Sequence, residues 1–302
     1  MNHCRRRLMI CPTLWMAIVS TAQRAWAAAA PVDEPLDASL REAVHTLPVP
    51  GTGASIVVTS FRPGGEGPFP WIMLSHGTGP SHDTNRNIGR YRHADLAREW
   101  TRRSYAVLVP VRRGYGASGG ARLADSYGSC AKPDFHHAGE EAARDLLATL
   151  AWARTQRDLD PTRWMLVGQS SGGFASIYTA SKRPQGLVAV LAFSPGRGGD
   201  PVRRRYEPCA SDRLAAQFAA VAPEIRVPVL WFYAQNDQYI GTNAQRLWFD
   251  SFRRAGGRGQ LIVVEPFREN LGHGVFPSAK GVPLWTGAVK EFFKAQDVQM
   301  PF

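Results

Sequence analysis

The sequence of 302 residues has few cysteines, no apolar run of membrane-spanning length and no internal repeat. Its four cysteines form no Cys-x-x-Cys pair, so a metal-binding or redox-active cysteine motif is not expected. The most apolar stretch, residues 8–19, is shorter than the ~20 residues that a membrane-spanning helix needs. No segment recurs at a fixed period, which argues against a solenoid or a propeller.

Acidic residues are also scarce: 25 Asp and Glu stand against 36 Lys and Arg, which gives a formal net charge of +11. The arginines are spread along the chain without interleaved aromatic residues, so nucleic acid is not an expected partner. Hydrophobic residues make up 44% of the chain, enough for a sizeable core without metals. The histidines lack the spacing of a zinc site, and we expect no metal and no cofactor. The histidines considered as ligands are His76, His82, His93, His136 and His137.

The N-terminus has the three parts of a secretory signal peptide. Arg5, Arg6 and Arg7 precede the apolar stretch, and Ala25-Trp26-Ala27 is a small-x-small cleavage pattern. We therefore expect a signal peptide at residues 1–27, a leader at 28–54 and a catalytic domain at 55–302. A retained membrane anchor is the alternative. The signal peptide predicts a secreted or periplasmic protein with no stable membrane anchor, and the sequence gives no oligomeric state.

Removal of a signal peptide would leave Cys130 and Cys209 as the cysteines of the mature chain. Two thiols in an oxidising compartment predict one disulfide between them. It would join the loop after a strand at 106–111 to the segment after a strand at 188–193. Two separate buried thiols are the alternative.

Short apolar runs alternate with helical patterns over most of the chain. The expected strands are residues 56–61, 71–74, 106–111, 164–167, 188–193, 229–233 and 261–264, and the expected helices are 91–103, 137–155, 173–182, 242–255 and 285–295. This alternation predicts an α/β protein with a mainly parallel sheet and helices on both faces. Residues 196–223, with a short helix at 214–221, form an excursion between two strands and are expected to make a lid or rim.

The pattern Gly-Gln-Ser-Ser-Gly at residues 168–172 lies between a strand and a helix. A nucleophile elbow has this context, because small residues let the chain turn sharply with the nucleophile at its tip. We therefore expect Ser170 to be a catalytic nucleophile. The backbone N–H of Ser171 would be one oxyanion donor, with no catalytic use of its side chain. The second donor is expected from Thr78 or Gly77, in the loop after the strand at 71–74.

A serine nucleophile needs a base and an orienting acid, in the chain order Ser, Asp, His for this architecture. His273 is the only histidine after Ser170 and follows the last expected strand. Asp237 follows the strand at 229–233, and Asp200 is the competing acid. Tyr239 and Phe276, beside the acid and the base, are candidates for the walls of the substrate pocket.

These residues resemble the α/β-hydrolase superfamily and, within it, the dienelactone-hydrolase-like branch. The resemblance covers residues 56–293. It rests on Ser75-His76-Gly77, the motif Arg-Gly-Tyr-Gly-Ala-Ser at 113–118, the elbow, and the loops of Asp237 and His273. Dienelactone hydrolases proper have a cysteine nucleophile, whereas this chain has Ser170. The resemblance therefore implies a serine hydrolase acting on a small-molecule carboxylic ester.

Two other functions are compatible with the same residues. Prolyl peptidases share the fold, but they usually carry a propeller or a large cap, and the sequence has neither. A binding protein on a hydrolase scaffold would usually have lost a member of the triad, and all three are present.

Overall fold

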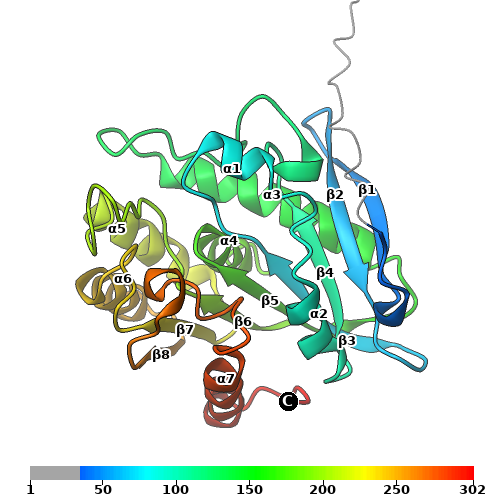
Figure 1. Ribbon diagram of the computed structural model, residues 1–302. Coiled ribbons are helices and arrows are strands. Elements are labelled where there is room, and N and C mark those ends of the chain that lie inside the picture. Colours follow the sequence, from blue (N-terminus) through cyan, green and yellow to red (C-terminus); the bar gives the residue numbers. More distant parts are fainter. Residues whose placement is uncertain (1–34) are drawn as a thin grey trace, which may run out of the picture.

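Eight strands form a single twisted sheet at the centre of the protein, in the order β1-β2-β4-β3-β5-β6-β7-β8 (Figure 1). The computed structural model describes residues 35–302, so the expected signal peptide and residues 28–34 of the expected leader lie outside the described residues. β1 and β2 are antiparallel to their neighbours, and β4, β3, β5, β6, β7 and β8 are parallel. The strands are β1 (Ala43–Val49), β2 (Ala54–Phe61), β3 (Phe69–Ser75), β4 (Ala106–Val111), β5 (Leu159–Gln169), β6 (Leu187–Phe193), β7 (Val229–Ala234) and β8 (Gly259–Val264).

Helices cover both faces of this sheet (Figure 1). The buried side chains of α3, α4, α5 and α6 belong to the core on one face, and those of α2 and α7 belong to the core on the other. The helices are α1 (His82–Arg86), α2 (Ala94–Thr101), α3 (Phe135–Ala153), α4 (Ser171–Ala180), α5 (Ser211–Val221), α6 (Thr242–Arg254) and α7 (Val282–Gln296). The 3-10 helices are η1 (Ala38–Leu40), η2 (Gly116–Ser118), η3 (Ala222–Glu224) and η4 (Glu269–Gly272). No helix described between residues 35 and 302 is long and apolar enough to cross a membrane.

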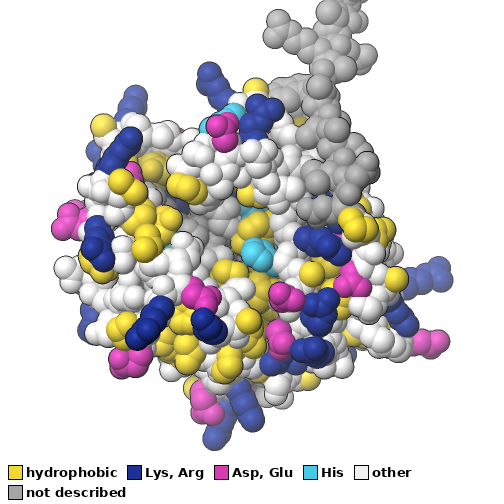
Figure 2. All heavy atoms as spheres, viewed as in Figure 1, with side chains coloured by type: hydrophobic (Ala, Val, Ile, Leu, Met, Phe, Trp, Pro, Cys, Tyr) yellow, Lys and Arg dark blue, Asp and Glu magenta, His cyan; other side chains and the backbone are white. Residues whose placement is uncertain are grey.

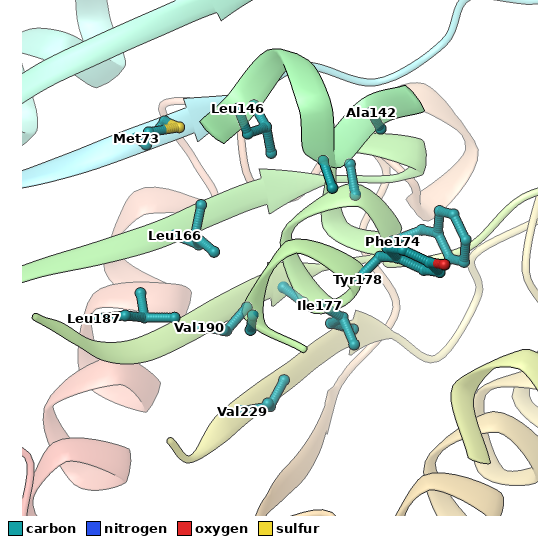
Figure 3. Close-up of a cluster of buried hydrophobic side chains, with 14 of the residues drawn as sticks. Met73, Ala142, Leu146, Leu166, Phe174, Ile177, Tyr178, Leu187, Val190 and Val229 are labelled. Carbon is teal, nitrogen blue, oxygen red and sulfur yellow. The ribbon is translucent and has the colours of Figure 1, made fainter. Parts of the chain in front are cut away.

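The central helix α4 is buried along its whole length between the sheet and its neighbouring helices. Figure 3 shows Phe174 and Ile177 of α4 among side chains of α3 and of the strands. Along β7, Trp231 and Phe232 are both fully buried but belong to the cores on opposite faces, as the two-residue period of a strand requires. The sheet therefore holds α4, and with it the segment before α4, in a rigid position.

The expected α/β fold and its parallel sheet are confirmed, and each of the seven expected strands is present. Residues 43–49, which we assigned to the leader of residues 28–54, form the edge strand β1, paired with β2, so the sheet begins before residue 55. Leu47 and Val49 of this strand are buried, whereas Val44 and Thr46 are exposed. One exposed face and a proline at position 48 made the apolar pattern too weak to recognise. The short α1 was not predicted either.

The excursion between β6 and β7 has two parts. Its helix α5 buries Leu214 and Phe218 completely in the core, so this half is structural and not a lid. The first half lies along the loop after β7: Tyr206 N–H donates to the Gln238 oxygen, and Gly241 N–H donates to the Tyr206 oxygen. This half therefore forms a rim.

The expected disulfide is present. Cys130 and Cys209 are bonded, with their Cα atoms 5.5 Å apart. The bond joins the loop before α3 to the excursion before α5, as predicted. Arg204, in the same excursion, donates to Cys130 Sγ at 3.4 Å.

Candidate active site

Ser170 lies in a sharp turn between β5 and α4, with φ 55° and ψ −123°. A positive φ in a residue other than glycine is sparsely populated and costs ~1–3 kcal/mol, which the surrounding structure must supply. The turn needs glycine on both sides. A Cβ at Gly168 would lie 2.2 Å from the Gly172 oxygen, and a Cβ at Gly172 would lie 2.1 Å from the Ser75 oxygen. The geometry is that of the expected elbow.

The backbone of the elbow is also fixed from the neighbouring strand. Ser170 N–H donates to the Phe193 oxygen at 2.9 Å, and Gly196 N–H donates to the Ser170 oxygen at 3.1 Å. Both partners lie at the carboxyl end of β6. Ser170 is therefore held at the edge of the sheet where the loops of parallel strands meet, which is the usual place of a ligand site in such folds.

Asp237 and His273 come from the loops after β7 and β8, and their side chains are in contact. His273 Nδ1 lies 2.8 Å from Asp237 Oδ2. The other carboxylate oxygen accepts the N–H groups of Tyr239 and Ile240. Asp237 is fully buried and His273 is 6% exposed. A carboxylate at Nδ1 keeps the proton on that nitrogen and leaves Nε2 free to accept one.

The histidine loop reaches this position through a tightly turned backbone. Asn270 and Leu271 both have a positive φ, and a Cβ at Gly272 would lie 2.6 Å from the Asn236 oxygen. The two loops therefore pack backbone against backbone, which positions the imidazole over Asp237. Asp200, the competing acid, instead accepts the N–H groups of Val202 and Arg203 in its own turn.

Gln169, the residue before Ser170, connects the elbow to the histidine loop. Its Nε2 donates to the His273 carbonyl oxygen at 2.9 Å. No direct hydrogen bond between Ser170 and His273 is present among the described side chains. Contacts between nucleophile and base are often long in free enzymes and tighten when substrate binds. The structure thus brings the Asp237–His273 pair beside the elbow.

The three expected oxyanion donors also lie around Ser170. A Cβ at Gly77 would lie only 3.3 Å from the Ser170 Cβ. Ser171 is the first residue of α4, and the first N–H groups of a helix have no partner within it. Thr78 Oγ1 lies 2.7 Å from Ser171 Oγ. The loop after β3 and the start of α4 are therefore joined directly beside Ser170.

His76 is the other histidine close to the elbow, and its hydrogen bonds leave it no role as a base. Its Nε2 accepts the Arg112 N–H at 3.0 Å, and its Nδ1 lies 2.8 Å from the Gly77 oxygen. Complete burial, together with the charge of Arg112, lowers the pKa of His76 well below the ordinary histidine value. His76 is therefore neutral and structural.

The sequence did not reveal a buried polar network behind the elbow. Arg112 Nε and Arg197 Nη2 both bind Asp125 Oδ2, at 3.0 and 2.6 Å, and Tyr115 donates to Asp125 Oδ1 at 2.9 Å. Arg113, the first residue of the motif at 113–118, anchors its turn to Asp145 instead. A signal was available, because Arg112 follows β4 directly and Arg197 closely follows β6, at the edge where Ser170 lies.

The two expected pocket residues have different surroundings. Tyr239 is half-buried, and its ring stacks on His273 with 4.5 Å between the ring centroids. Phe276 is 1% exposed and stacks on Phe193 at 4.1 Å, inside the core. The prediction that Phe276 walls a substrate pocket is therefore wrong, since its ring is already covered by core side chains.

Figure 2 shows this side of the molecule hollowed between the part that carries α1 and the part that carries α5 and α6. A separate cavity of about 630 Å³ lies over β1 and β2, under the loop of residues 113–124, and none of the expected catalytic residues lines it. Within residues 35–302 no group of three His, Cys, Asp or Glu side chains is placed to hold a metal ion.

A family model for the X-Pro dipeptidyl-peptidases of family S15 matches residues 52–205, just over half of the chain. The chain belongs to this family. The S15 match includes Gly77, Thr78 and the Ser170 elbow and ends before Asp237 and His273. No curated protein sequence matches the chain significantly.

Solved structures of hydrolases share the fold. An esterase of Pyrococcus furiosus has a TM-score of 0.57 at 16% identity, with 85% of this chain and 91% of that chain covered. A dienelactone hydrolase-like promiscuous phosphotriesterase from metagenomic libraries has a TM-score of 0.56 at 16% identity, with 84% and 98% covered. An acylaminoacyl peptidase of Pyrococcus horikoshii has a TM-score of 0.56 at 12% identity, with 86% of this chain and 42% of the peptidase covered. At these identities the likeness shows the α/β-hydrolase fold alone. Together with the S15 membership, it supports a hydrolase of the esterase or peptidase type.

Proposed function

We propose that this S15-family protein is an exported serine hydrolase that cleaves carboxylic esters through an acyl-enzyme on Ser170. The observation that carries the proposal is the buried Asp237–His273 pair beside a strained serine elbow. The positive φ of Ser170 costs free energy, and a catalytic role for its hydroxyl would account for that cost.

In the proposed reaction His273 Nε2 takes the proton of Ser170 while Oγ attacks the carbonyl carbon of the ester. The carbonyl oxygen becomes an oxyanion, held by the N–H of Ser171 and that of Thr78 or Gly77. His273 then gives the proton to the departing alkoxide, and an acyl-enzyme remains. A water molecule, deprotonated by His273, attacks the acyl-enzyme and releases the acid. Asp237 holds the imidazole in one tautomer throughout.

Peptide cleavage after an Xaa-Pro pair is the second candidate, and the S15 match favours it. The same acyl-enzyme chemistry would serve an amide, with an amine as the leaving group. Ester cleavage is supported by the small size of the excursion between β6 and β7, since prolyl peptidases usually carry a large cap. Half of this excursion is the core helix α5.

Export is part of the proposal. It is supported by the signal-type sequence of residues 1–27 and by the Cys130–Cys209 disulfide, since stable disulfides belong to oxidising compartments. Expression of the full chain in bacteria, followed by N-terminal sequencing of the exported form, tests it.

The test of the activity uses the mature protein from residue 28 and two substrate series. One series contains p-nitrophenyl esters from acetate to dodecanoate, and the other contains Xaa-Pro-p-nitroanilides. A fluorophosphonate probe should label the parent protein and leave Ser170→Ala unlabelled. Hydrolysis of the esters with negligible release of nitroaniline supports the esterase, and the reverse pattern supports the dipeptidyl-peptidase. A parent protein that neither labels nor hydrolyses either series refutes both.

A further inference from the structure

Five side chains close a ring of hydrogen bonds behind the elbow. Arg112 Nη2 lies 3.3 Å from Ser171 Oγ, Ser171 Oγ 2.7 Å from Thr78 Oγ1, and Thr78 Oγ1 2.8 Å from the Tyr115 hydroxyl. The Tyr115 hydroxyl donates to Asp125 Oδ1 at 2.9 Å, and Arg112 Nε donates to Asp125 Oδ2 at 3.0 Å. We call these five residues the buried ring. Arg112, Asp125, Tyr115 and Ser171 are all at most 3% exposed.

The chemistry of the members fixes the direction of every bond in the ring. Burial disfavours the charged form of Asp125, but Arg197 and Arg112 outweigh it and hold the pKa of Asp125 well below its ordinary value. Asp125 is therefore a carboxylate and can only accept. Burial, followed by the charge of Asp125, raises the pKa of Tyr115 to about 12, so Tyr115 keeps its proton and donates it to Asp125.

The remaining hydroxyls follow from that one. Because the proton of Tyr115 is used, its oxygen accepts from Thr78, and because the proton of Thr78 is used, its oxygen accepts from Ser171. The Ser171 oxygen then accepts from Arg112, which can only donate. A ring with one possible direction has no alternative arrangement, so it holds Thr78 and Ser171 in single positions.

Arg112 also binds the rest of the loop after β3. Its Nη1 donates to Ser75 Oγ at 2.8 Å and to the His76 oxygen at 2.7 Å. The ring thus fastens two separate segments, residues 75–78 and the first residue of α4, to one arginine. These are the segments from which both oxyanion donors are expected.

The buried ring and Arg197 together place charge near the site. Arg112 and Arg197 share the single carboxylate of Asp125, which leaves one net positive charge in a buried cluster. Arg197 adjoins Gly196, whose N–H binds the Ser170 oxygen. A fixed positive charge in a region of low dielectric stabilises negative charge that develops nearby.

We propose that Tyr115 and Asp125 are positioning residues of the oxyanion hole, acting through Thr78 and Ser171, which the buried ring holds at the spacing that the tetrahedral intermediate requires. The inference rests on the proposed serine hydrolase function. It also corrects the expectation that the Ser171 side chain has no use, because its hydroxyl is a link of the ring.

The test compares Tyr115→Phe with Tyr178→Phe. Each variant loses one tyrosine hydroxyl and keeps the aromatic side chain. Tyr178 lies on α4, where its hydroxyl donates to Glu140 at 2.7 Å, and it takes no part in the buried ring. For Tyr115→Phe we expect kcat on a p-nitrophenyl ester to fall about 10-fold or more, with KM changed by less than about 3-fold. Misplaced oxyanion donors weaken the binding of the transition state more than the binding of the substrate. For Tyr178→Phe we expect both constants to stay within about 2-fold of the parent.

A second measurement separates positioning from a merely structural role. A trifluoromethyl ketone forms a tetrahedral adduct with the serine, so its affinity should fall in Tyr115→Phe by the same factor as kcat. Ser171→Ala keeps the backbone N–H but breaks the ring, and should show the same pattern. It supplies the answer if Tyr115→Phe does not fold.

Parental kcat and parental inhibitor affinity in both ring variants would overturn the inference. An equal loss in Tyr178→Phe would overturn it as well. A parent protein that the fluorophosphonate does not label overturns the proposed function and this inference together, whereas a labelled parent with unaffected ring variants overturns the inference alone.

Discussion

Reduction of the Cys130–Cys209 disulfide should destabilise the protein strongly. The bond closes a loop with a sequence separation of 79 residues. In the chain-entropy model, a loop of that length is worth about 4.5 kcal/mol at 25 °C, an upper limit because the unfolded chain retains some structure. For a protein of this size, such a loss lowers the melting temperature by about 8 °C.

The assay is thermal unfolding of the mature protein with and without a phosphine reductant. The control is the double variant Cys130→Ala/Cys209→Ala, which should melt near the reduced protein and show no response to the reductant. The Asp125–Arg197 ion pair joins the same two segments at 2.6 Å, so ester hydrolysis at 25 °C should change less than stability. Equal melting temperatures of the oxidised and reduced forms, with the linked peptide seen by mass spectrometry, would refute the loop-entropy reasoning.

Three further substitutions test the elbow and the charge behind it. Ser170→Ala should lower kcat by ~10⁴-fold or more with an unchanged melting temperature, and turnover within 10-fold of the parent would exclude Ser170 as the nucleophile. Gly172→Ala places a Cβ 2.1 Å from the Ser75 oxygen, a backbone atom that cannot move aside, so we expect a loss of about 1–3 kcal/mol by urea unfolding and a much lower kcat; a stable, active variant would contradict the packing argument. The pKa of Asp125 is lowered on folding, so its contribution to stability is full above its ordinary value of 3.8 and is lost as the pH falls below it. Urea unfolding between about pH 5 and pH 2 should therefore show a steeper acid loss in the parent than in Asp125→Asn, and parallel curves would count against an ionised Asp125.

Much of the active-site region could be predicted because its signals are local in the sequence. The glycines at 168 and 172 stand where a strand turns into a helix, and the steric reason for them is the same in the sequence and in the structure. Asp237 and His273 each follow an apolar strand, and parallel strands bring such loops to one edge. Their contact at 2.8 Å follows from chain order and topology together.

Other features depended on which surfaces pack together, which the sequence does not specify by itself. Phe276 is close to His273 in the sequence, which suggested a pocket residue, but its ring packs on Phe193 in the core. The edge strand β1 is defined by its pairing with β2 and not by a strong pattern of its own.

The sequence by itself determined the fold class, the serine elbow, the chain order of the candidate acid and base, and the cysteine pair, because each of these is encoded by short patterns or by counting. Only the tertiary structure decided the buried ring. Asp125 lies 13 residues from Arg112, and Ser171 lies 59 residues from it. A polar side chain in a loop is solvated unless the fold buries it. Once buried, each donor of the ring must be hydrogen-bonded within the protein, because an unpaired buried donor costs free energy.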